Sequence, residues 1–266
     1  MFRENLLPYW WMLYRHSKVL NQRTDVFRNV EDAFTVKHAD PCLNAKSVYL
    51  DIGSGASVVP SFLYQRHKAW TYATELDQTH LEPQRNFMRT LGFNNDDKFI
   101  LQAEDATRLS FVNDSVTCIT AISTIEHIPG DGDTRAMAEF ARVLPSGGRL
   151  IVTVPASSTY MESESTFYYA GFERRYDPAA LHSRLFRQDL KLVDQLYMVP
   201  APPDFIRDFN DSFRESFHGE SWNEVWYKSG WHDQYPDVSI LLTLGFVRLS
   251  TDPNGSFGAC LAFEKK

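Results

Sequence analysis

Residues 49–57 read YLDIGSGAS, a short apolar run that ends in an acid and then in two glycines separated by a serine. A glycine turn between a strand and a helix lets bare backbone approach a ligand at the helix N-terminus. A dinucleotide fingerprint needs a third glycine three residues after the second, and Val58 stands there instead. The charge of Asp51 would repel a diphosphate and attract an amine or a sulfonium. The stretch therefore favours a cationic ligand.

Apolar runs and helix-compatible segments alternate from this turn onward. The runs cover residues 46–52, 69–76, 98–104, 115–122 and 148–155, and helical patterns cover 81–92 and 133–144. Strands alternating with helices predict a parallel sheet with right-handed crossovers, and runs that are apolar throughout predict helices on both faces. Residues 190–199 and 258–266 predict a sixth and a seventh strand, and Asp177 before Pro178 predicts a helix start. We expect a Rossmann-like, doubly wound α/β fold with a mostly parallel seven-stranded sheet.

The flanking segments predict four regions. Residues 1–45 form a helical segment that covers the pocket, 46–198 the ligand-binding core, 199–256 an aromatic-rich helical insertion or lid, and 257–266 the last core strand. Within this insertion a phenylalanine recurs every four residues, at Phe205, Phe209, Phe213 and Phe217. On a helix these side chains would form one stripe. The stripe either packs against the rest of the protein, forms a homodimer contact, or faces a ligand. A helix lying on a membrane surface is a second interpretation of the N-terminal segment.

Charge and cysteine content exclude several classes of protein. The 266 residues are 43% hydrophobic, enough for a substantial core, and the formal charge is -7 without a basic run. This balance argues against a nucleic-acid partner. Three scattered cysteines suit neither a disulfide framework nor a closed metal site, so we expect a reducing, cytoplasmic setting.

Two further acidic positions follow the second and third apolar runs. Glu75 ends the second run, where a carboxylate can accept both hydroxyls of a ribose. Asp105 and Ala106 follow the third run, where an adenine ring could be flanked and its exocyclic amine bonded. Because the carboxyl ends of parallel strands meet at one edge of a sheet, these positions predict a single nucleoside-binding site.

Together with STIEHIPGDGDTRAMAEFARVLPSGGRLIVTVP at residues 123–155, these motifs resemble a class I S-adenosylmethionine-dependent methyltransferase of the small-molecule branch. The resemblance covers residues 46–198 and the last strand. It implies that Asp51 supports the methionine amino group, directly or through water, and that Glu75 holds the ribose. The full set of implied cofactor contacts is Asp51, Gly53, Ser54, Gly55, Glu75, Leu76, Asp105, Ala106 and Ala121. One departure is Val116-Thr117, where such enzymes commonly carry an aromatic residue followed by aspartate.

His127, directly after the fourth run, is the candidate general base for a poor nucleophile. We expect its neighbour Glu126 to be exposed or ion-paired. A metal site of Glu126, His127, Asp131 and Asp133 can be imagined, but the resemblance requires no metal. This family often lines its acceptor pocket with the segment after the fifth strand. The candidate acceptor contacts in that segment are Tyr168, Tyr169, Arg174, Arg175 and Tyr176.

The expected activity is S-adenosylmethionine-dependent methyl transfer to oxygen or nitrogen of a small molecule or a glycan or lipid-linked precursor. Two alternatives stay open. One is a methyltransferase-like protein that binds without catalysis, and the other is an NAD-dependent oxidoreductase, which Val58 and Asp51 disfavour.

Overall fold

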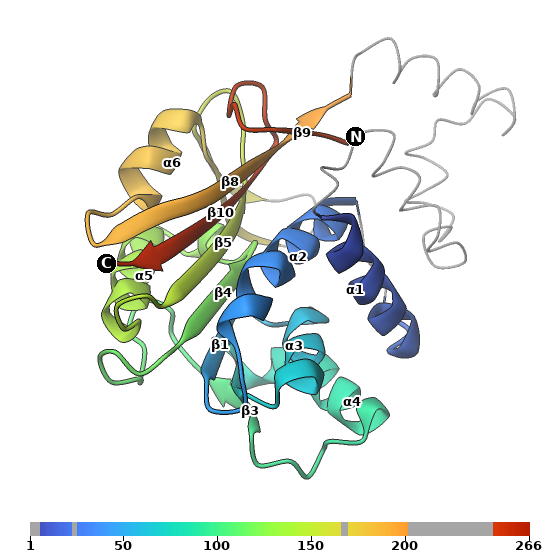
Figure 1. Ribbon diagram of the computed structural model, residues 1–266. Coiled ribbons are helices and arrows are strands. Elements are labelled where there is room, and N and C mark those ends of the chain that lie inside the picture. Colours follow the sequence, from blue (N-terminus) through green and yellow to red (C-terminus); the bar gives the residue numbers. More distant parts are fainter. Residues whose placement is uncertain (1–5, 23–25, 166–169, 202–246) are drawn as a thin grey trace, which may run out of the picture.

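The computed structural model describes residues 6–22, 26–165, 170–201 and 247–266 (Figure 1). The helices are α1 (Leu7–Val19), α2 (Val26–Ala39), α3 (Val59–His67), α4 (Glu82–Leu91), α5 (Gly132–Val143) and α6 (Pro178–Leu185), with short 3-10 turns η1 (Asp40–Cys42), η2 (Gln78–Leu81) and η3 (Ile125–His127). The strands are β1 (Val48–Ile52), β2 (Trp70–Glu75), β3 (Phe99–Ala103), β4 (Cys118–Ile122), β5 (Arg149–Pro155), β6 (Met161–Ser165), β7 (Ala170–Arg175), β8 (Leu190–Pro200), β9 (Val247–Ser250) and β10 (Gly258–Lys265).

Eight of these strands form one sheet in the order β3-β2-β1-β4-β5-β10-β8-β9. Strands β1 to β5 pair in parallel, whereas β10 and β9 run antiparallel to their neighbours. The predicted doubly wound, mostly parallel sheet is confirmed, although it has one more strand than expected because Val247–Ser250 pairs with the edge of β8. The strand order reverses between β1 and β4, which is where ligands bind in open α/β sheets.

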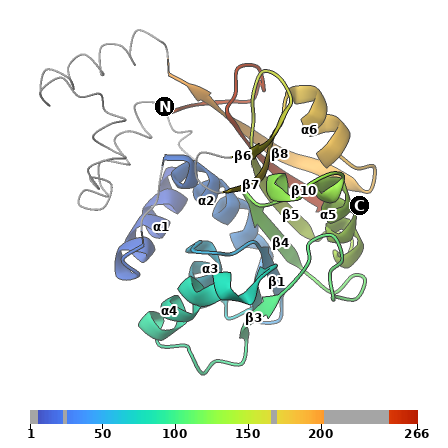
Figure 2. The ribbon, with the colours of Figure 1, turned by 180° about the vertical axis from the view of Figure 1, so that it is seen from behind.

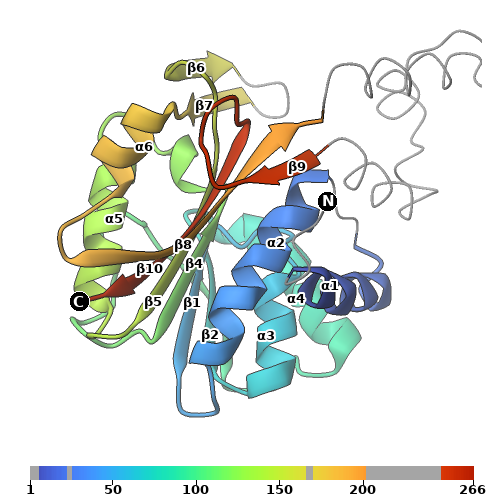
Figure 3. The same cartoon turned by 45° about the horizontal axis from the view of Figure 1, so that its top comes forward.

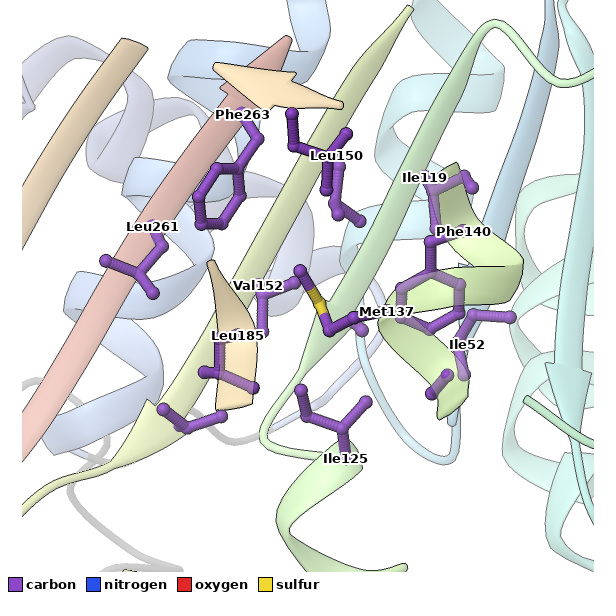
Figure 4. Close-up of a cluster of buried hydrophobic side chains, with 14 of the residues drawn as sticks. Ile52, Ile119, Ile125, Met137, Phe140, Leu150, Val152, Leu185, Leu261 and Phe263 are labelled. Carbon is purple, nitrogen blue, oxygen red and sulfur yellow. The ribbon is translucent and has the colours of Figure 1, made fainter. Parts of the chain in front are cut away.

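Helices cover both faces of the sheet (Figure 3). Side chains alternate between the faces along each strand, so Tyr49 packs in the cluster beneath α1 to α3 while Leu50 packs in the cluster beneath α5 and α6. Figure 4 shows the second cluster, in which Met137 and Phe140 of α5 lie against the sheet. This two-sided burial explains the apolar runs in the sequence.

Local signals fix the helix ends as predicted. Asp177 accepts a hydrogen bond from the Ala180 amide at 2.7 Å, which caps α6. Helix α4 ends at Gly92, whose φ of 75° lies in the left-handed region. Along the described ranges, no helix combines the length and the apolar character needed to cross a membrane.

A two-stranded hairpin, β6 with β7, lies beside the carboxyl ends of β4 and β5 (Figures 2 and 3). It follows directly from β5, and Ala156 bridges to Tyr176 just past β7. Because it packs on η3, the hairpin is placed at the edge of the sheet where the predicted site lies.

Candidate functional site

The turn after β1 brings bare backbone to the carboxyl edge of the sheet. Gly53 and Gly55 have φ values of 69° and 40°, so both positions favour glycine. A Cβ atom on Gly53 would overlap the side chain of Thr124, which lies just past the end of β4. From α4, the buried Gln84 donates to the carbonyls of Gly55 (3.1 Å) and Ser57 (2.7 Å). The turn is thus held by Gln84 from α4 and by its own Ser54, whose hydroxyl accepts a hydrogen bond from the Thr74 amide at 3.0 Å.

Glu75 joins the end of β2 to this turn. Its Oε1 accepts a hydrogen bond from the Gly55 amide at 2.9 Å, and partial burial raises its pKa. The next residue, Leu76, is 75% exposed. A carboxylate beside bare backbone and an exposed apolar side chain form a surface with one polar and one apolar part, as a nucleoside requires.

Asp51 lies below the turn and is only 2% exposed. Its Oδ1 accepts hydrogen bonds from the hydroxyl of Tyr49 (3.3 Å) and from Thr120 on the adjacent β4. Burial raises the pKa of Asp51 to about 6, while hydrogen bonds from its neighbours partly oppose the shift. The structure therefore gives Asp51 a buried role in joining β1 to β4.

Residues after β3 and at the end of β4 complete the carboxyl edge of the sheet. Asp105 is exposed, and its Oδ1 accepts from the amide (2.8 Å) and hydroxyl (2.7 Å) of Thr107, while Ala106 is 7% exposed. The preceding Glu104 is turned inward and accepts from the Ser110 amide at 3.0 Å. Ala121 is fully buried and pairs in register with Ile52 at the end of β1.

The η3 turn carries the base candidate. His127 is 43% exposed at its side chain, and its Nδ1 lies 3.0 Å from the carbonyl of Phe172 on β7. Of the two settings expected for Glu126, exposed or ion-paired, the exposed one is wrong, because this residue is 1% exposed. Its Oε1 is 3.8 Å from His127 Nε2, and its Oε2 has no hydrogen-bond partner among the described residues. Burial raises the pKa of Glu126 well above its usual range, and the nearby Glu31 adds to the shift.

Helix α2, which lies far from β4 in the sequence, also contacts the carboxyl edge of the sheet at the end of β4. Arg28 donates to the carbonyl of Ile122 (3.2 Å) and to Glu31 (3.0 Å). Glu31 in turn accepts from the hydroxyl of Ser123 at 2.8 Å. The N-terminal segment therefore bonds the last carbonyl of β4 and the side chain of Ser123, contacts that no local sequence signal indicated.

The candidate acceptor contacts divide into three groups. Tyr168 and Tyr169 lie outside the described residues, as do the four phenylalanines of the predicted stripe. Arg175 is exposed and pairs with Glu173 at 3.1 Å. Arg174 and Tyr176 have no exposed surface, so in this structure neither can contact an acceptor.

Their partner is Asp133, one of the residues of the imagined metal site. Asp133 accepts from Tyr176 at 2.8 Å and from Arg184 at 2.7 and 2.8 Å, and Arg174 lies 3.3 Å away. In the described part of the chain, no three His, Cys, Asp or Glu side chains are placed to hold a metal ion together.

Comparisons with known proteins agree with this geometry. Residues 50–152 match the model of the methyltransferase domain family. A curated relative, methyltransferase GfsG of Streptomyces halstedii, is 30% identical over 123 residues, which make up 46% of this chain and 43% of that protein. The match thus spans less than half the length of that relative.

Solved structures extend the likeness of the fold. Geranyl diphosphate C-methyltransferase from Streptomyces coelicolor A3(2), in complex with Mg2+, geranyl diphosphate and S-adenosyl-L-homocysteine, has a TM-score of 0.58 at 13% identity, covering 90% of this chain and 78% of that chain. A phosphoethanolamine N-methyltransferase of Haemonchus contortus has a TM-score of 0.53 at 14% identity, covering 95% of this chain and 56% of that chain.

Proposed function

We propose that this chain, whose core is a class I S-adenosylmethionine-dependent methyltransferase domain, transfers a methyl group to oxygen or nitrogen of a small-molecule acceptor. The observation that carries the proposal is the turn after β1. Two glycines with left-handed backbone stand beside a carboxylate bonded to the Gly55 amide, and Leu76 is exposed next to it. A glycan or lipid-linked acceptor belongs to the same proposal, because its reacting group is also a hydroxyl or an amine.

The residues present fit the cofactor. At Gly55 a ligand can approach the backbone closely, since no heavy atom lies nearer than 3.5 Å to a Cβ placed there. Glu75 would hold the ribose, Leu76 would cover the adenine, and Asp105 with Ala106 would flank its edge. Asp51 and Ala121 would support the methionine portion from below. When bound, S-adenosylmethionine supplies a methyl group on a sulfonium, which is already a good leaving group.

The chain's own residues then need to align the acceptor, exclude water and take one proton. A carbonyl oxygen can only accept a hydrogen bond, so the contact with Phe172 requires that Nδ1 of His127 carry its hydrogen. In the neutral ring Nε2 is then the basic atom. We propose that Nε2 takes the proton of the acceptor hydroxyl or amine as the new bond to the methyl carbon forms.

Helix α2 supports a further part of the proposal, that residues 1–45 cover the pocket. Its contacts with Ile122 and Ser123 lie beside the β4 end of the predicted site. A cover at this edge would keep water from the reacting atoms.

Calorimetry tests the cofactor assignment. We expect S-adenosylhomocysteine to bind the purified protein and NAD to give no heat, because Val58 replaces the third glycine of a dinucleotide site. Binding of NAD alone would refute the proposal.

Activity is then measured by methyl incorporation from labelled S-adenosylmethionine into pooled small-molecule hydroxyl and amine compounds. Incorporation that the His127→Asn variant loses would support the proposal. Cofactor binding with no incorporation into any pool would favour the methyltransferase-like protein that binds without catalysis.

A further inference from the structure

Arg174 is a fully buried cation, and two of its hydrogen bonds go to the segment that follows His127. Its Nη1 donates to the carbonyl of Ile128 at 2.9 Å and its Nη2 to the carbonyl of Gly130 at 2.8 Å. A guanidinium can satisfy both carbonyls at once because its donors form a rigid planar fork. Arg174 thus fixes the backbone one and three residues beyond His127.

The same guanidinium also contacts the residue that orients the histidine ring. Its central carbon lies 4.8 Å from the centre of the Phe172 ring, and the Phe172 carbonyl accepts the hydrogen bond from His127 Nδ1. The side chain of Arg174 therefore contacts both sides of the hydrogen bond between His127 and Phe172: the segment next to the η3 turn and strand β7. The strand and the turn come from segments 45 residues apart, and Arg174 is one of the side chains that connect them.

The surroundings of Arg174 make its position rigid. Asp133, also without exposed surface, lies 3.3 Å from Nη1, and the hydroxyl of Tyr160 accepts from Nε at 3.1 Å. Asp133 is held in turn by Tyr176 and Arg184. A buried ion pair has few alternative arrangements, because each displaced charge would lose its partner in a low-dielectric interior.

We propose that Arg174 is a positioning residue for methyl transfer: by fixing the η3 turn against Phe172, it selects the Nδ1-protonated tautomer of His127 and leaves Nε2 to accept the proton of the acceptor. This inference rests on the proposed function, but the tautomer is a property of the protein alone. It gives Arg174 a different task from the acceptor contact expected from the sequence.

The test uses the full chain labelled with 15N in histidine, at about pH 9, where imidazole rings are ordinarily neutral. The two ring nitrogens of a neutral imidazole resonate far apart, and the His127→Asn spectrum identifies the signals of this ring. We expect one tautomer, with hydrogen on Nδ1. The Arg174→Lys variant keeps the charge but loses the fork, so it should show a mixture of tautomers. The matched control is Arg175→Lys, the same change at the next residue, which is exposed and paired with Glu173, and its spectrum should equal that of the wild type.

Phe172→Leu is a milder variant for the case that Arg174→Lys does not fold. It keeps the backbone carbonyl but removes the ring next to the guanidinium, and it should show a measurable second tautomer. Once an acceptor is known, Arg174→Lys should lower kcat about tenfold or more while the affinity for S-adenosylhomocysteine stays that of the wild type.

Two results would overturn the inference: a wild-type ring protonated on Nε2, or variants of Arg174 and Phe172 that both keep the wild-type tautomer. These results are distinct from a failure of the proposed function, which would appear as absent cofactor binding whatever the tautomer.

Discussion

Replacing Gly53 by alanine changes the turn at the end of β1 in two separable ways. The backbone φ of 69° is in the left-handed region, which an alanine adopts only at a cost. The new Cβ would also overlap Thr124, whose hydroxyl donates to the carbonyls of Ile52 (3.0 Å) and Ile122 (3.1 Å). The contact cannot be relieved without moving a side chain that joins β1 to β4.

The two effects have different magnitudes and different controls. The left-handed backbone costs about 1–2 kcal/mol for a residue with a Cβ, and overpacking costs about 1–3 kcal/mol. We therefore expect Gly53→Ala to lower the free energy of unfolding by about 2–5 kcal/mol. Gly92→Ala is the matched control, because its φ is 75° and no heavy atom lies within 4 Å of its Cβ position. It should lose only the backbone part, about 1–2 kcal/mol.

Urea denaturation followed by tryptophan fluorescence measures both variants. A double-mutant cycle with Thr124→Ala separates the terms, because that background removes the contacts with Cγ2 and Oγ1 and leaves only the Cβ contact at 3.0 Å. In that background Gly53→Ala should cost about 1–2 kcal/mol. Equal losses for Gly53→Ala and Gly92→Ala, or an unchanged loss of Gly53→Ala in the Thr124→Ala background, would refute the reasoning.

Three further predictions concern acids and the base. Burial raises the pKa of Asp51 from 3.8 to about 6. Between these two values the folded state therefore keeps a proton that the unfolded chain has released. The stability of the wild type relative to Asp51→Asn should fall by up to about 3 kcal/mol as the pH rises from about 4 to about 7. A pH-independent difference in unfolding free energy would contradict this. Glu75→Ala should weaken S-adenosylhomocysteine binding in calorimetry by about 1–3 kcal/mol, whereas the exposed Asp77→Ala should not; equal affinities would remove Glu75 from the site. His127→Asn should lower kcat about 10²–10⁴-fold at unchanged cofactor affinity, and a retained rate would exclude it as the base.

Hydrophobic runs and turn residues predicted the sheet because they report local burial and local backbone conformation. The run at 46–52 became β1, and the glycines after it have the left-handed conformation that a strand-to-helix turn uses. The edge strand β9 was not predicted as a strand. Its four residues, VRLS, carry too short a pattern, and only pairing with β8 makes them extended.

Polar residues were harder to assign, because residue type does not reveal burial. The sequence Glu-Arg-Arg-Tyr suggested an acceptor surface, but Arg174 and Tyr176 point to Asp133, a partner about forty residues earlier in the chain. Glu126 is buried, and the acid that contributes most to its raised pKa, Glu31, comes from the N-terminal segment. Such contacts depend on tertiary packing, which the local pattern does not encode.

The pairing of β8 with β9 has a consequence for the entropy of the chain. Pro200 and Val247 are register partners, so the two points where the chain leaves and rejoins the sheet are fixed side by side. Closing a loop between fixed ends becomes costlier only slowly with length, by about 0.6 kcal/mol for each doubling. The entropy cost of joining Pro200 to Val247 therefore depends only weakly on the number of residues between them.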